Sequence, residues 1–591
     1  MNITGAQIVT EVLCEQGCDT VFGYPGGQVI DLYDALWLAK DRIRHVLTAH
    51  EQGAAHAADG YARASGKVGV VIATSGPGAT NLVTGLATAH LDSVPLVAVT
   101  GNVPSGLIGR DAFQEVDIVG VSMPVTKHNF IVKDVTRLAE TLRLAFKIAK
   151  SGRPGPVLVD IPKDVQTASC EFEPAAAPIE AEPKKTSSNH RLRWAKEMIE
   201  KSRRPYIYFG GGIISGDASA ELLAFAERCD APMGCSLMGL SAVPTDHPRF
   251  LGMQGMHGHF AASAAEQEAD LVIALGVRFS DRATGDGDSF AERFRVLHID
   301  IDAAELNKNI HAQLSVQGDV KDALSRLTEI LPQQHHPTWM KRIRALRREE
   351  AGRTAHSHEM RDARSGLQKG MGTVTETDAD RHFLLPPGQS YDTSPCLTHE
   401  QIIDGIEAAK TGSCIAVTDV GQHQMWAAQR CHLTVPRCFL TSGGLGTMGF
   451  GLGAAVGAYI ATGRRPVLFT GDGCFRMNLT ELATAVAEKV PVVIVIFNNG
   501  VLGMVRQWQT LFFDGHHSAT TLPRTADFVK IAEGFGAGAM RAHTPEELKA
   551  TAETAFAQEM PFVIDCITDP DETVLPMLPP GGSFADLITE I

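Results

Sequence analysis

Short apolar runs that end in glycine or in polar residues recur along this chain, separated by segments of helical periodicity. Residues 466–470 form such a run and end at Gly471, and a second run ends in the pair Asn498 and Asn499. Strands buried on both faces of a parallel sheet have this pattern, because helices cover the sheet on each side. The stretch therefore predicts a strand–helix–strand unit with polar groups at the carboxyl ends of both strands, where open α/β sheets bind ligands.

Several helix starts are marked by an N-cap residue with Glu or Gln three positions later. The pairs are Thr4 with Gln7, Thr398 with Gln401, and Asn478 with Glu481. We expect the helix that begins after Asn478 to end near Lys489, because Pro491 follows it.

Strand and helix patterns alternate over three regions, which predicts an α/β fold of three doubly wound parallel-sheet domains. The regions are residues 1–165, 191–335 and 397–575. Within the first, we expect a tight turn at 21–27, a strand at 43–50, a helix at 51–64, and within 68–78 and 95–104 two further strands that end in glycine loops. Residues 166–190, rich in Ala, Pro and Glu, predict an interdomain linker. Residues 336–396 predict an extended linker with a basic, solvated helix at 338–350, to which we assign no chemistry.

Composition narrows the class of protein. The 591 residues carry a net charge of −15 and are 44% hydrophobic, which is ample for buried cores. The negative charge argues against a nucleic-acid partner, since such proteins carry a basic footprint. We expect no membrane partner, because no run reaches the roughly 18 uncharged apolar residues of a membrane span. The N-terminus lacks a signal-peptide pattern, and the 11 dispersed cysteines predict free thiols in a reducing cytoplasm.

The glycine-bracketed acid at 471–473 has the chemistry of a metal-bridged phosphate site. Gly471 and Gly473 lack a Cβ, which lets the backbone approach a ligand closely. Asp472 offers a carboxylate oxygen and Asn499 an amide oxygen. Mg²⁺ favours such hard oxygen donors, with phosphate oxygens and water completing its octahedron. The alternative is a turn in which Asp472 and Asn499 only cap their elements.

These residues carry a resemblance to a known family. The triplet 471–473 followed by Asn498 and Asn499 resembles the thiamine-diphosphate motif. Residues 502–509, LGMVRQWQ, are similar to the catalytic subunits of the acetohydroxyacid (acetolactate) synthase family, and the likeness extends over most of the chain. It implies a pyrimidine-binding, a central FAD-binding and a diphosphate-binding domain, with thiamine diphosphate, Mg²⁺ and FAD as cofactors.

In the first domain, the resemblance implies that Glu51 is the catalytic glutamate, which hydrogen-bonds the cofactor's aminopyrimidine and promotes loss of the thiazolium C2 proton. Taken alone, a carboxylate at a helix start is more simply a capping group. The residues implied to line the aminopyrimidine side are Tyr24, Pro25, Thr74, Pro77, Asn81 and Gln114. Gln114 is also implied near the substrate, with Phe113. Lys127 suits an anionic keto acid, although a loop lysine is usually a solvated surface charge.

In the central domain, the resemblance implies an FAD site. Its residues are Gly211, Gly212, Ser236, Leu237, Met238, His257, Gly276, Arg278, Arg282, Asp300, Ile301, Asp319 and Val320. Glycine loops at strand ends suit a dinucleotide, but the run 210–212 lacks the GxGxxG spacing and is by itself typical of a tight turn. Arg282 is also implied to receive the carboxylate of a second keto acid, and the alternative is an ion pair with Asp281.

In the third domain, the implied diphosphate residues are Gly421, Gln422, His423, Gly446, Met448, Gly471, Asp472, Gly473, Cys474, Asn499, Gly503 and Met504. Asp472, Asn499 and Val501 are the implied metal ligands. Met448 resembles the wedge that holds the cofactor bent, where core filling is the alternative. Met504 and Trp508 lie four apart on one predicted helix face, which also suits core packing. By resemblance Trp508 bounds the second substrate.

The implied reaction is decarboxylation of pyruvate and its ligation to a second 2-keto acid, giving 2-acetolactate or 2-aceto-2-hydroxybutyrate in branched-chain amino acid biosynthesis. The family implies a homodimer or homotetramer in which Glu51 and the metal site meet across subunits, and it is compatible with a regulatory small subunit. A pyruvate oxidase, a decarboxylase that releases acetaldehyde, and a non-catalytic binding paralogue stay open. The segment around Trp508 argues against the second, and the presence of Glu51, Asp472 and Asn499 against the third.

Overall fold

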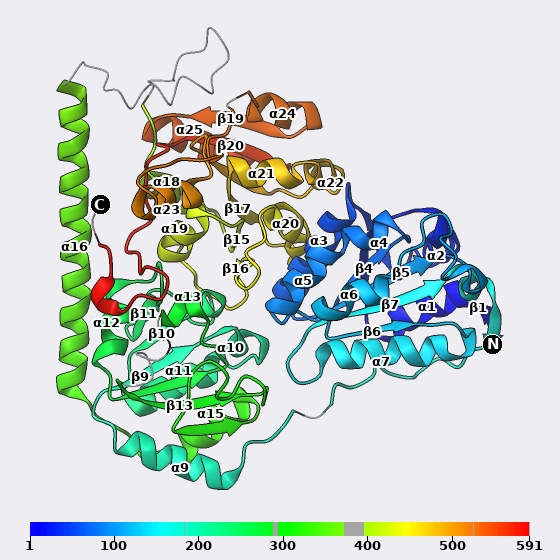
Figure 1. The fold of residues 1–591 in the computed structure, drawn as a ribbon, viewed down its shortest axis with the longest axis horizontal. Coiled ribbons are helices and arrows are strands. Elements are labelled where there is room, and N and C mark those ends of the chain that lie inside the picture. Colours follow the sequence, from blue (N-terminus) through cyan, green and yellow to red (C-terminus); the bar gives the residue numbers. More distant parts are fainter. Residues whose placement is uncertain (183, 286, 288–292, 371–394, 524, 590–591) are drawn as a thin grey trace.

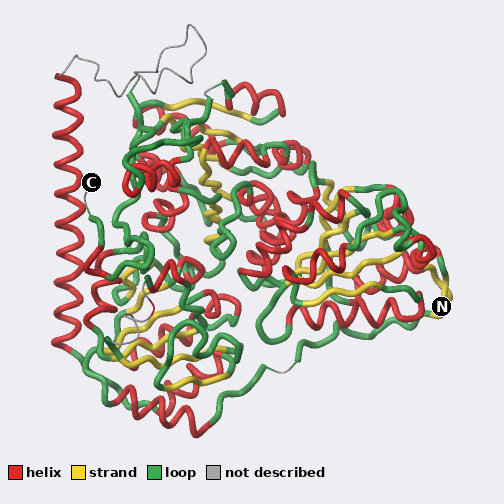
Figure 2. The backbone as a smooth tube through the Cα atoms, in the orientation of Figure 1, coloured by secondary structure: helices red, strands yellow, loops and turns green. Residues whose placement is uncertain are grey.

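The computed structural model describes residues 1–182, 184–285, 287, 293–370, 395–523 and 525–589. The chain forms three α/β bodies, each built on a six-stranded parallel sheet with helices on its faces (Figures 1 and 2). In Figure 1 the first body is blue to cyan at the right, the second is green below, and the third is yellow to red above. The predicted fold class is confirmed.

The first body holds the sheet of order β3-β2-β4-β5-β7-β6. Its strands are β2 (Thr20–Tyr24), β3 (Arg44–Leu47), β4 (Gly69–Ala73), β5 (Leu96–Asn102), β6 (His128–Ile131) and β7 (Pro156–Pro162). Its helices are α1 (Gly5–Glu15), α2 (Ile30–Leu38), α3 (Glu51–Ser65), α4 (Pro77–Asn81), α5 (Val83–Leu91), α6 (Ile118–Ser122), α7 (Leu138–Lys150) and α8 (Lys163–Thr167). An antiparallel pair, β1 (Asn2–Thr4) and β8 (Ser169–Glu171), closes one end.

The second body holds the sheet of order β11-β10-β9-β12-β13-β14. Its strands are β9 (Pro205–Phe209), β10 (Met233–Cys235), β11 (Phe250–Met253), β12 (Leu271–Leu275), β13 (Arg295–Asp300) and β14 (Leu314–Gln317). Its helices are α9 (Asn189–Glu200), α10 (Gly211–Ser215), α11 (Ser219–Cys229), α12 (Phe260–Glu268), α13 (Asp281–Thr284), α15 (Val320–Ile330) and α16 (Pro337–Gly370).

The third body holds the sheet of order β16-β15-β17-β18-β20-β19. Its strands are β15 (Ile415–Thr418), β16 (Phe439–Leu440), β17 (Pro466–Gly471), β18 (Val493–Asn498), β19 (Gly538–Ala542) and β20 (Phe562–Ile567). Its helices are α18 (His399–Ala409), α19 (Gln422–Arg430), α20 (Phe450–Thr462), α21 (Asp472–Asn478), α22 (Glu481–Ala487), α23 (Gly503–Phe512), α24 (Phe528–Phe535) and α25 (Pro545–Ala557).

The strand orders fix where ligands can bind. Numbered within each body, the first and third sheets share the order 2-1-3-4-6-5, and the middle sheet has the order 3-2-1-4-5-6 of dinucleotide-binding folds. In each case the chain reverses direction across the sheet beside the first strand. At that switch point the connections on either side leave toward opposite faces, which opens a crevice at the carboxyl ends of the strands.

The structure confirms some of the local expectations from the sequence and contradicts others. The capping boxes of Thr4 and Thr398 are confirmed. The N-cap role of Asn478 is wrong: this residue ends α21, and its side-chain amide donates to the carbonyl of Gly449 at 2.7 Å. The tight turn expected at 21–27 is also wrong in its first half, because Val21 and Phe22 are fully buried in strand β2.

The first and third bodies touch through α3 and α20, which pack closely because small residues face each other. A Cβ on Gly457 would come 1.8 Å from the carbonyl oxygen of Ala57, and one on Gly60 would come 2.2 Å from that of Ala454. Backbones at such distances leave no room for side chains, so the glycines set the spacing of the two helices.

Helix α16 occupies most of the described part of the segment predicted as a linker, and in Figure 1 it is a long rod at the left edge. One of its faces is not solvated as expected, because Trp339, Ile343 and Leu346 are buried against the second body. Residues 371–394 of that segment lie outside the described residues. Among the helices described, none combines the length and apolar character that a membrane crossing requires.

Candidate active site

The predicted metal ligands of the third body lie at adjacent strand ends. Strands β17 and β18 are paired with Gly471 opposite Phe497, so Asp472 and Asn499 follow neighbouring strands at the same sheet edge. Both residues are buried, with 1% and 9% of their surface exposed. The amide oxygen of Asn499 also accepts the N–H of Val501 at 3.0 Å, which fixes its orientation. A carboxylate, an amide oxygen and a main-chain carbonyl form a donor set that suits Mg²⁺ alongside phosphate oxygens.

The loop after β15 supplies the other side of the switch point. His423 is buried, which lowers its pKa to about 3 and keeps the imidazole neutral. Within the described part of the chain, Nε2 of His423 and Oε1 of Gln422 are buried without a hydrogen-bond partner. Buried polar atoms of this kind are costly unless a ligand or water satisfies them. They therefore fit a polar group such as a diphosphate at this edge.

Glycines line the same crevice where side chains would collide. A Cβ on Gly503 would lie 2.0 Å from Oε1 of Gln422, and one on Gly473 would lie 2.9 Å from Leu502. Gly446 has a φ of +72°, a conformation that favours glycine. The crevice is thus shaped by backbone, as a site for a phosphate-bearing cofactor requires.

Gly421, also predicted at this edge, is the N-cap of α19. Three further predicted residues differ in surroundings. Met448 is half-buried, and its terminal methyl lies 3.8 Å from the position of a Cβ on Gly473. The thiol of Cys474 donates to the carbonyl of Val420 at 3.0 Å, and burial raises its pKa well above the usual value. Met504 packs against the core on α23.

At the matching switch point of the first body, Glu51 is the first residue of α3 and is 9% exposed. Its carboxylate accepts a hydrogen bond from the side-chain amide of Asn81 at 2.9 Å. The N-cap position belongs to His50, whose ring accepts the N–H of Gln52 at 3.1 Å, whereas Glu51 lies in the first turn of α3. Glu51 therefore has a buried carboxylate whose side-chain partner is Asn81.

The other predicted pyrimidine-side residues gather around the ends of β2 and β4. Tyr24 ends β2 and Pro25 follows it, while Thr74 follows β4 and Pro77 begins α4. Gln114, with a φ of +61°, approaches this turn, since its Cα lies 3.0 Å from the position of a Cβ on Gly76. Its neighbour Phe113 is 84% exposed.

Lys127 is not brought to this edge. It lies before β6, where its N–H donates to Pro156 at the start of β7, so it is at the opposite, amino end of the strands. Its ammonium donates to the carbonyls of Ile148 and Ser151 at the end of α7, and burial lowers its pKa to about 8. In this chain the amine therefore caps a helix.

The switch point of the middle sheet lies between β9 and β12. Gly212 and Gly276 approach so closely there that a Cβ on Gly212 would come 2.6 Å from the Cα of Gly276. Gly276 has a φ of +54°, and the N–H of Gly212 donates to its carbonyl at 3.1 Å. Such backbone proximity at a helix start suits a dinucleotide.

The remaining residues predicted for FAD follow the neighbouring strands. Asp300 ends β13, and burial raises its pKa to about 6. Asp319 is the N-cap of α15, which Val320 begins. Burial lowers the pKa of His257 to about 4, and its Nδ1 lies 3.3 Å from the carbonyl of Pro576. The others are Gly211 at the start of α10, Ser236, Leu237 and Met238 after β10, Arg278 after β12, and Ile301 after β13.

Arg282 and Trp508, both predicted to contact substrate, meet although they come from different bodies. The guanidinium carbon of Arg282 lies 5.4 Å from the centre of the Trp508 ring. The alternative partner of Arg282, Asp281, is 3.7 Å away, and both members of that pair are largely exposed. An ion pair so exposed contributes little, so the guanidinium stays available to an anion.

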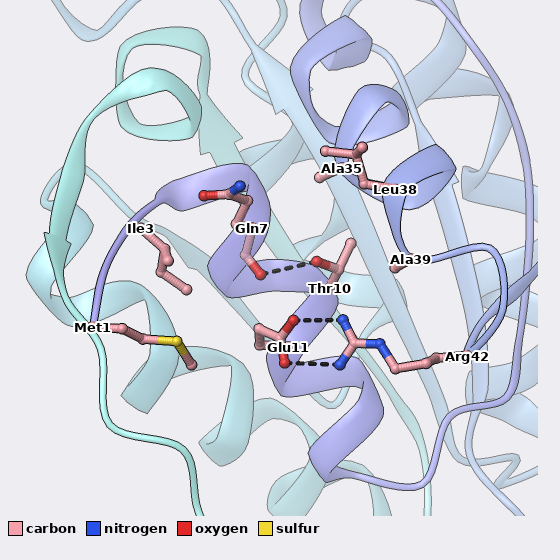
Figure 3. Close-up of a pocket in the computed structure, with 9 residues that line it drawn as sticks. All are labelled: Met1, Ile3, Gln7, Thr10, Glu11, Ala35, Leu38, Ala39 and Arg42. Carbon is pink, nitrogen blue, oxygen red and sulfur yellow. Dashed lines mark hydrogen bonds and ion pairs between the residues drawn. The ribbon is translucent and has the colours of Figure 1, made fainter.

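A pocket of about 130 Å³ lies elsewhere, at the N-terminal end of the first body (Figure 3). It is lined by Met1, Ile3, Gln7, Thr10, Glu11, Ala35, Leu38, Ala39 and Arg42. Glu11 and Arg42 pair with each other across it, which occupies its charged groups. None of its lining residues was predicted for the site.

Comparison with known proteins identifies the family. Three family profiles match, described as the N-terminal TPP binding, central and C-terminal TPP binding domains of thiamine pyrophosphate enzymes, over residues 3–121, 192–327 and 419–566. The acetolactate synthase isozyme 2 large subunit of Escherichia coli K12 is 44% identical, with 100% of both chains covered. The chain belongs to the acetolactate synthase large-subunit family. A probable large subunit from Methanocaldococcus jannaschii is 43% identical over 99% of this chain and 95% of that relative, and one from Mycobacterium tuberculosis is 45% identical over 98% and 91%.

Two further residues support the site although sequence reasoning assigned them no such role. The carboxylate of Glu481 accepts the N–H groups of Ala49 and His50 at 3.3 and 3.0 Å, so it holds the start of the helix that carries Glu51. Gln507 is buried and accepts from the side-chain amide of Gln422 at 3.1 Å. The polar Gln507 on the buried face of a helix was the available signal, since buried amides need partners.

Proposed function

We propose that this chain decarboxylates pyruvate and ligates the remaining two-carbon unit to a second 2-keto acid, giving 2-acetolactate or 2-aceto-2-hydroxybutyrate. The observation that carries this proposal is the pairing of β17 with β18, which brings Asp472 and Asn499 to one sheet edge in a chain of this family. The corresponding edge of the first sheet carries Glu51 and Asn81.

Different residues hold the metal, receive the diphosphate and move the proton in this proposal. Asp472, Asn499 and the carbonyl of Val501 hold Mg²⁺, while the backbone near His423 and Gly446 receives the diphosphate. When bound, thiamine diphosphate supplies the electron sink that decarboxylation needs. Glu51 then holds and moves a proton at its carboxyl oxygen, in an orientation set by its hydrogen bond from Asn81.

The second keto acid is bound by the pair between the two bodies. The guanidinium of Arg282 receives the carboxylate, and the ring of Trp508 bounds the side chain of the substrate. The contact between guanidinium and ring supports this division, because it places a cation beside an apolar wall.

FAD is proposed for the middle sheet. Its strand order and the close approach of Gly212 to Gly276 support a dinucleotide, and Asp300 and Asp319 offer acceptors at the ends of the next two strands. As the family resemblance implies, the flavin takes no net redox part.

A homodimer, alone or within a tetramer, is proposed as the active unit. Large apolar side chains are exposed near both ligand-binding edges: Phe113 by 84% beside Gln114 on the first body, and Met477 by 58% on the third, in the helix that Asp472 begins. Apolar groups gathered at a polar site are typical of a surface that a second copy covers. A regulatory small subunit is a further proposed partner. The 11 free cysteines support a reducing, cytoplasmic setting.

The test is product analysis with pyruvate, thiamine diphosphate and Mg²⁺. We expect acetoin that forms only after acid treatment, since acid decarboxylates acetolactate, and a mixed product when 2-ketobutyrate is added. Oxygen consumption that matches pyruvate loss would instead indicate an oxidase, and free acetaldehyde would indicate a simple decarboxylase. Binding of the cofactors without turnover would contradict any catalytic role.

A further inference from the structure

The loop of residues 441–449, which joins β16 to α20, passes between all three bodies. Near its start, a Cβ on Gly443 would lie 2.3 Å from the sulfur of Met238, and one on Gly444 would lie 3.2 Å from a guanidinium nitrogen of Arg278. Met238 and Arg278 belong to the proposed flavin pocket. Farther along, the same loop carries Met448, which belongs to the proposed thiamine-diphosphate crevice. One short loop therefore connects the two cofactor sites.

Asp92, from the first body, holds this loop by hydrogen bonds. Its side chain has no exposed surface, and its two oxygens accept the N–H groups of Gly443 and Gly444 at 3.1 and 2.7 Å. Hydrogen bonds to an ionised acceptor are stronger than those between neutral groups. Two consecutive glycines have wide conformational freedom, so a charged acceptor shared by their N–H groups removes much of it.

Arg63 stabilises this arrangement of Asp92 and the loop. Its Nη2 donates to Asp92 at 2.9 Å and its Nη1 to the carbonyl of Thr441 at 2.9 Å, while Asp59 accepts from Nε and also from Nη2. At the other end of the loop, the hydroxyls of Thr88 and Thr447 are 2.7 Å apart. The first body thus fixes the loop at its start, its glycines and its end.

The residue after Asp92 makes a second link to the flavin pocket. Ser93 accepts a hydrogen bond from Arg153 at 2.7 Å, and the same guanidinium donates to Glu305 at 2.6 Å. Arg153 also lies 3.5 Å from Asp302, whose N–H donates to Asp300 of the proposed flavin pocket at 2.8 Å. The turn at 92–93 therefore touches the segments that border both sites.

We propose that Asp92 is a positioning residue that couples the flavin pocket to the thiamine-diphosphate crevice by fixing the loop of residues 441–449. Flavin packed against Met238 and Arg278 favours one position of Gly443 and Gly444. The hydrogen bonds from these glycines to Asp92 transmit that position along the loop to Met448. Each cofactor then binds more tightly when the other is present. By thermodynamic linkage, FAD raises the affinity for thiamine diphosphate by the same factor as thiamine diphosphate raises the affinity for FAD. The inference rests on the proposed function, in particular on FAD in the middle body.

The test measures FAD binding by fluorescence quenching on flavin-free protein, with and without saturating thiamine diphosphate and Mg²⁺. We expect thiamine diphosphate to tighten FAD binding about fivefold or more in the wild-type chain, within the usual range of coupling between sites. Independent binding of the two cofactors would overturn the proposal alone. If FAD did not bind under either condition, the flavin assignment would fail and the coupling with it.

Asp92→Asn replaces one acceptor oxygen by a donor that faces N–H groups. The coupling ratio, which is the dissociation constant of FAD without thiamine diphosphate divided by the constant with it, should therefore fall toward one. The matched control is Asp134→Asn, since Asp134 also accepts a backbone N–H, that of Thr136 at 2.9 Å, but on an exposed turn. It should keep the wild-type ratio. If Asp92→Asn does not fold, Gly444→Ala serves instead, because its Cβ would come 2.8 Å from Asp92 and displace the loop sterically. A folded Asp92→Asn or Gly444→Ala variant with the full wild-type ratio would overturn the proposal.

Discussion

The guanidinium carbon of Arg282 lies 5.4 Å from the ring centre of Trp508, across the boundary between the second and third bodies. A cation beside an aromatic face is stabilised by roughly 0.5–1 kcal/mol at an exposed site and by more when water is excluded. The pair places a cation beside a flat apolar ring at this boundary, where we propose that the second keto acid binds.

Replacing Trp508 by Leu should change the ratio of the two products when pyruvate and 2-ketobutyrate compete, because a smaller wall alters the space for the acceptor's side chain. One methylene in an apolar pocket accounts for about 10-fold or more in selectivity. Product ratios measured by chromatography check this. Phe513→Leu is the control, since Phe513 directly follows the same helix and is exposed, and equal ratios in wild type and Trp508→Leu would contradict the assignment.

Replacing Asp472 by Asn should weaken thiamine-diphosphate binding and its dependence on Mg²⁺, because the metal loses its charged protein ligand. Titration of the cofactor at several Mg²⁺ concentrations measures this, and we expect an affinity loss of about 100-fold or more. The control is Asp404→Asn, which removes only a surface ion pair with Arg430. Unchanged affinity in Asp472→Asn would remove the residue from the metal site.

Mixing Glu51→Gln with Asp472→Asn chains should restore activity that neither variant has alone. If each site takes Glu51 from one copy and Asp472 from the other, half of the sites in a hybrid dimer are intact. Random exchange then gives about a quarter of wild-type activity. Differently tagged chains verify that hybrids form. Hybrids without activity would show that both residues serve one site within a single chain.

Replacing Gly212 by Ala should weaken flavin binding, because the new Cβ would lie 2.6 Å from the Cα of Gly276 and the backbone can move aside only at a cost in free energy. Flavin absorbance of the purified protein measures the effect, and we expect a loss of at least tenfold in affinity. Gly352→Ala on α16 is the control, since its Cβ would meet nothing within 4 Å. Normal flavin content in Gly212→Ala would contradict the pocket.

The pH dependence of stability should change when Glu266 is replaced by Gln. Burial raises the pKa of Glu266 to about 8, whereas the unfolded chain has the ordinary value of 4.5. Between these values the folded state holds a proton that the unfolded state has lost, so this contribution is complete below the lower pKa and is lost as the pH rises toward 8. The decline amounts to at most about 1.4 kcal/mol per pH unit.

Gln cannot ionise, and its carbonyl can still accept from Gln254, which donates to the Glu266 carboxyl. Urea unfolding at pH 5, 6, 7 and 8 should therefore show a flatter stability profile for Glu266→Gln than for wild type. The exposed Glu553→Gln variant should keep the wild-type slope. Parallel profiles for wild type and Glu266→Gln would contradict the buried neutral carboxyl.

Much of the fold follows from local pattern. Apolar runs such as 466–470 could be assigned to buried strands because both faces of a parallel sheet are covered, and Thr4 and Thr398 mark real helix starts. Asn478 is not an N-cap because its side-chain amide donates to the carbonyl of Gly449, a residue distant in sequence. The residues close to Asn478 in the sequence do not reveal that partner.

The sequence by itself determined the class of fold, the alternation of strands and helices, and the oxygen donors at 472 and 499, since these depend on periodicity and on side-chain chemistry within a few residues. Only the tertiary structure decided which strand ends become neighbours, that Arg282 meets Trp508, and that Lys127 caps α7 instead of reaching the site edge. The physical reason is strand order: the pairing of strands is a contact between distant segments, and it alone determines which polar ends share a crevice.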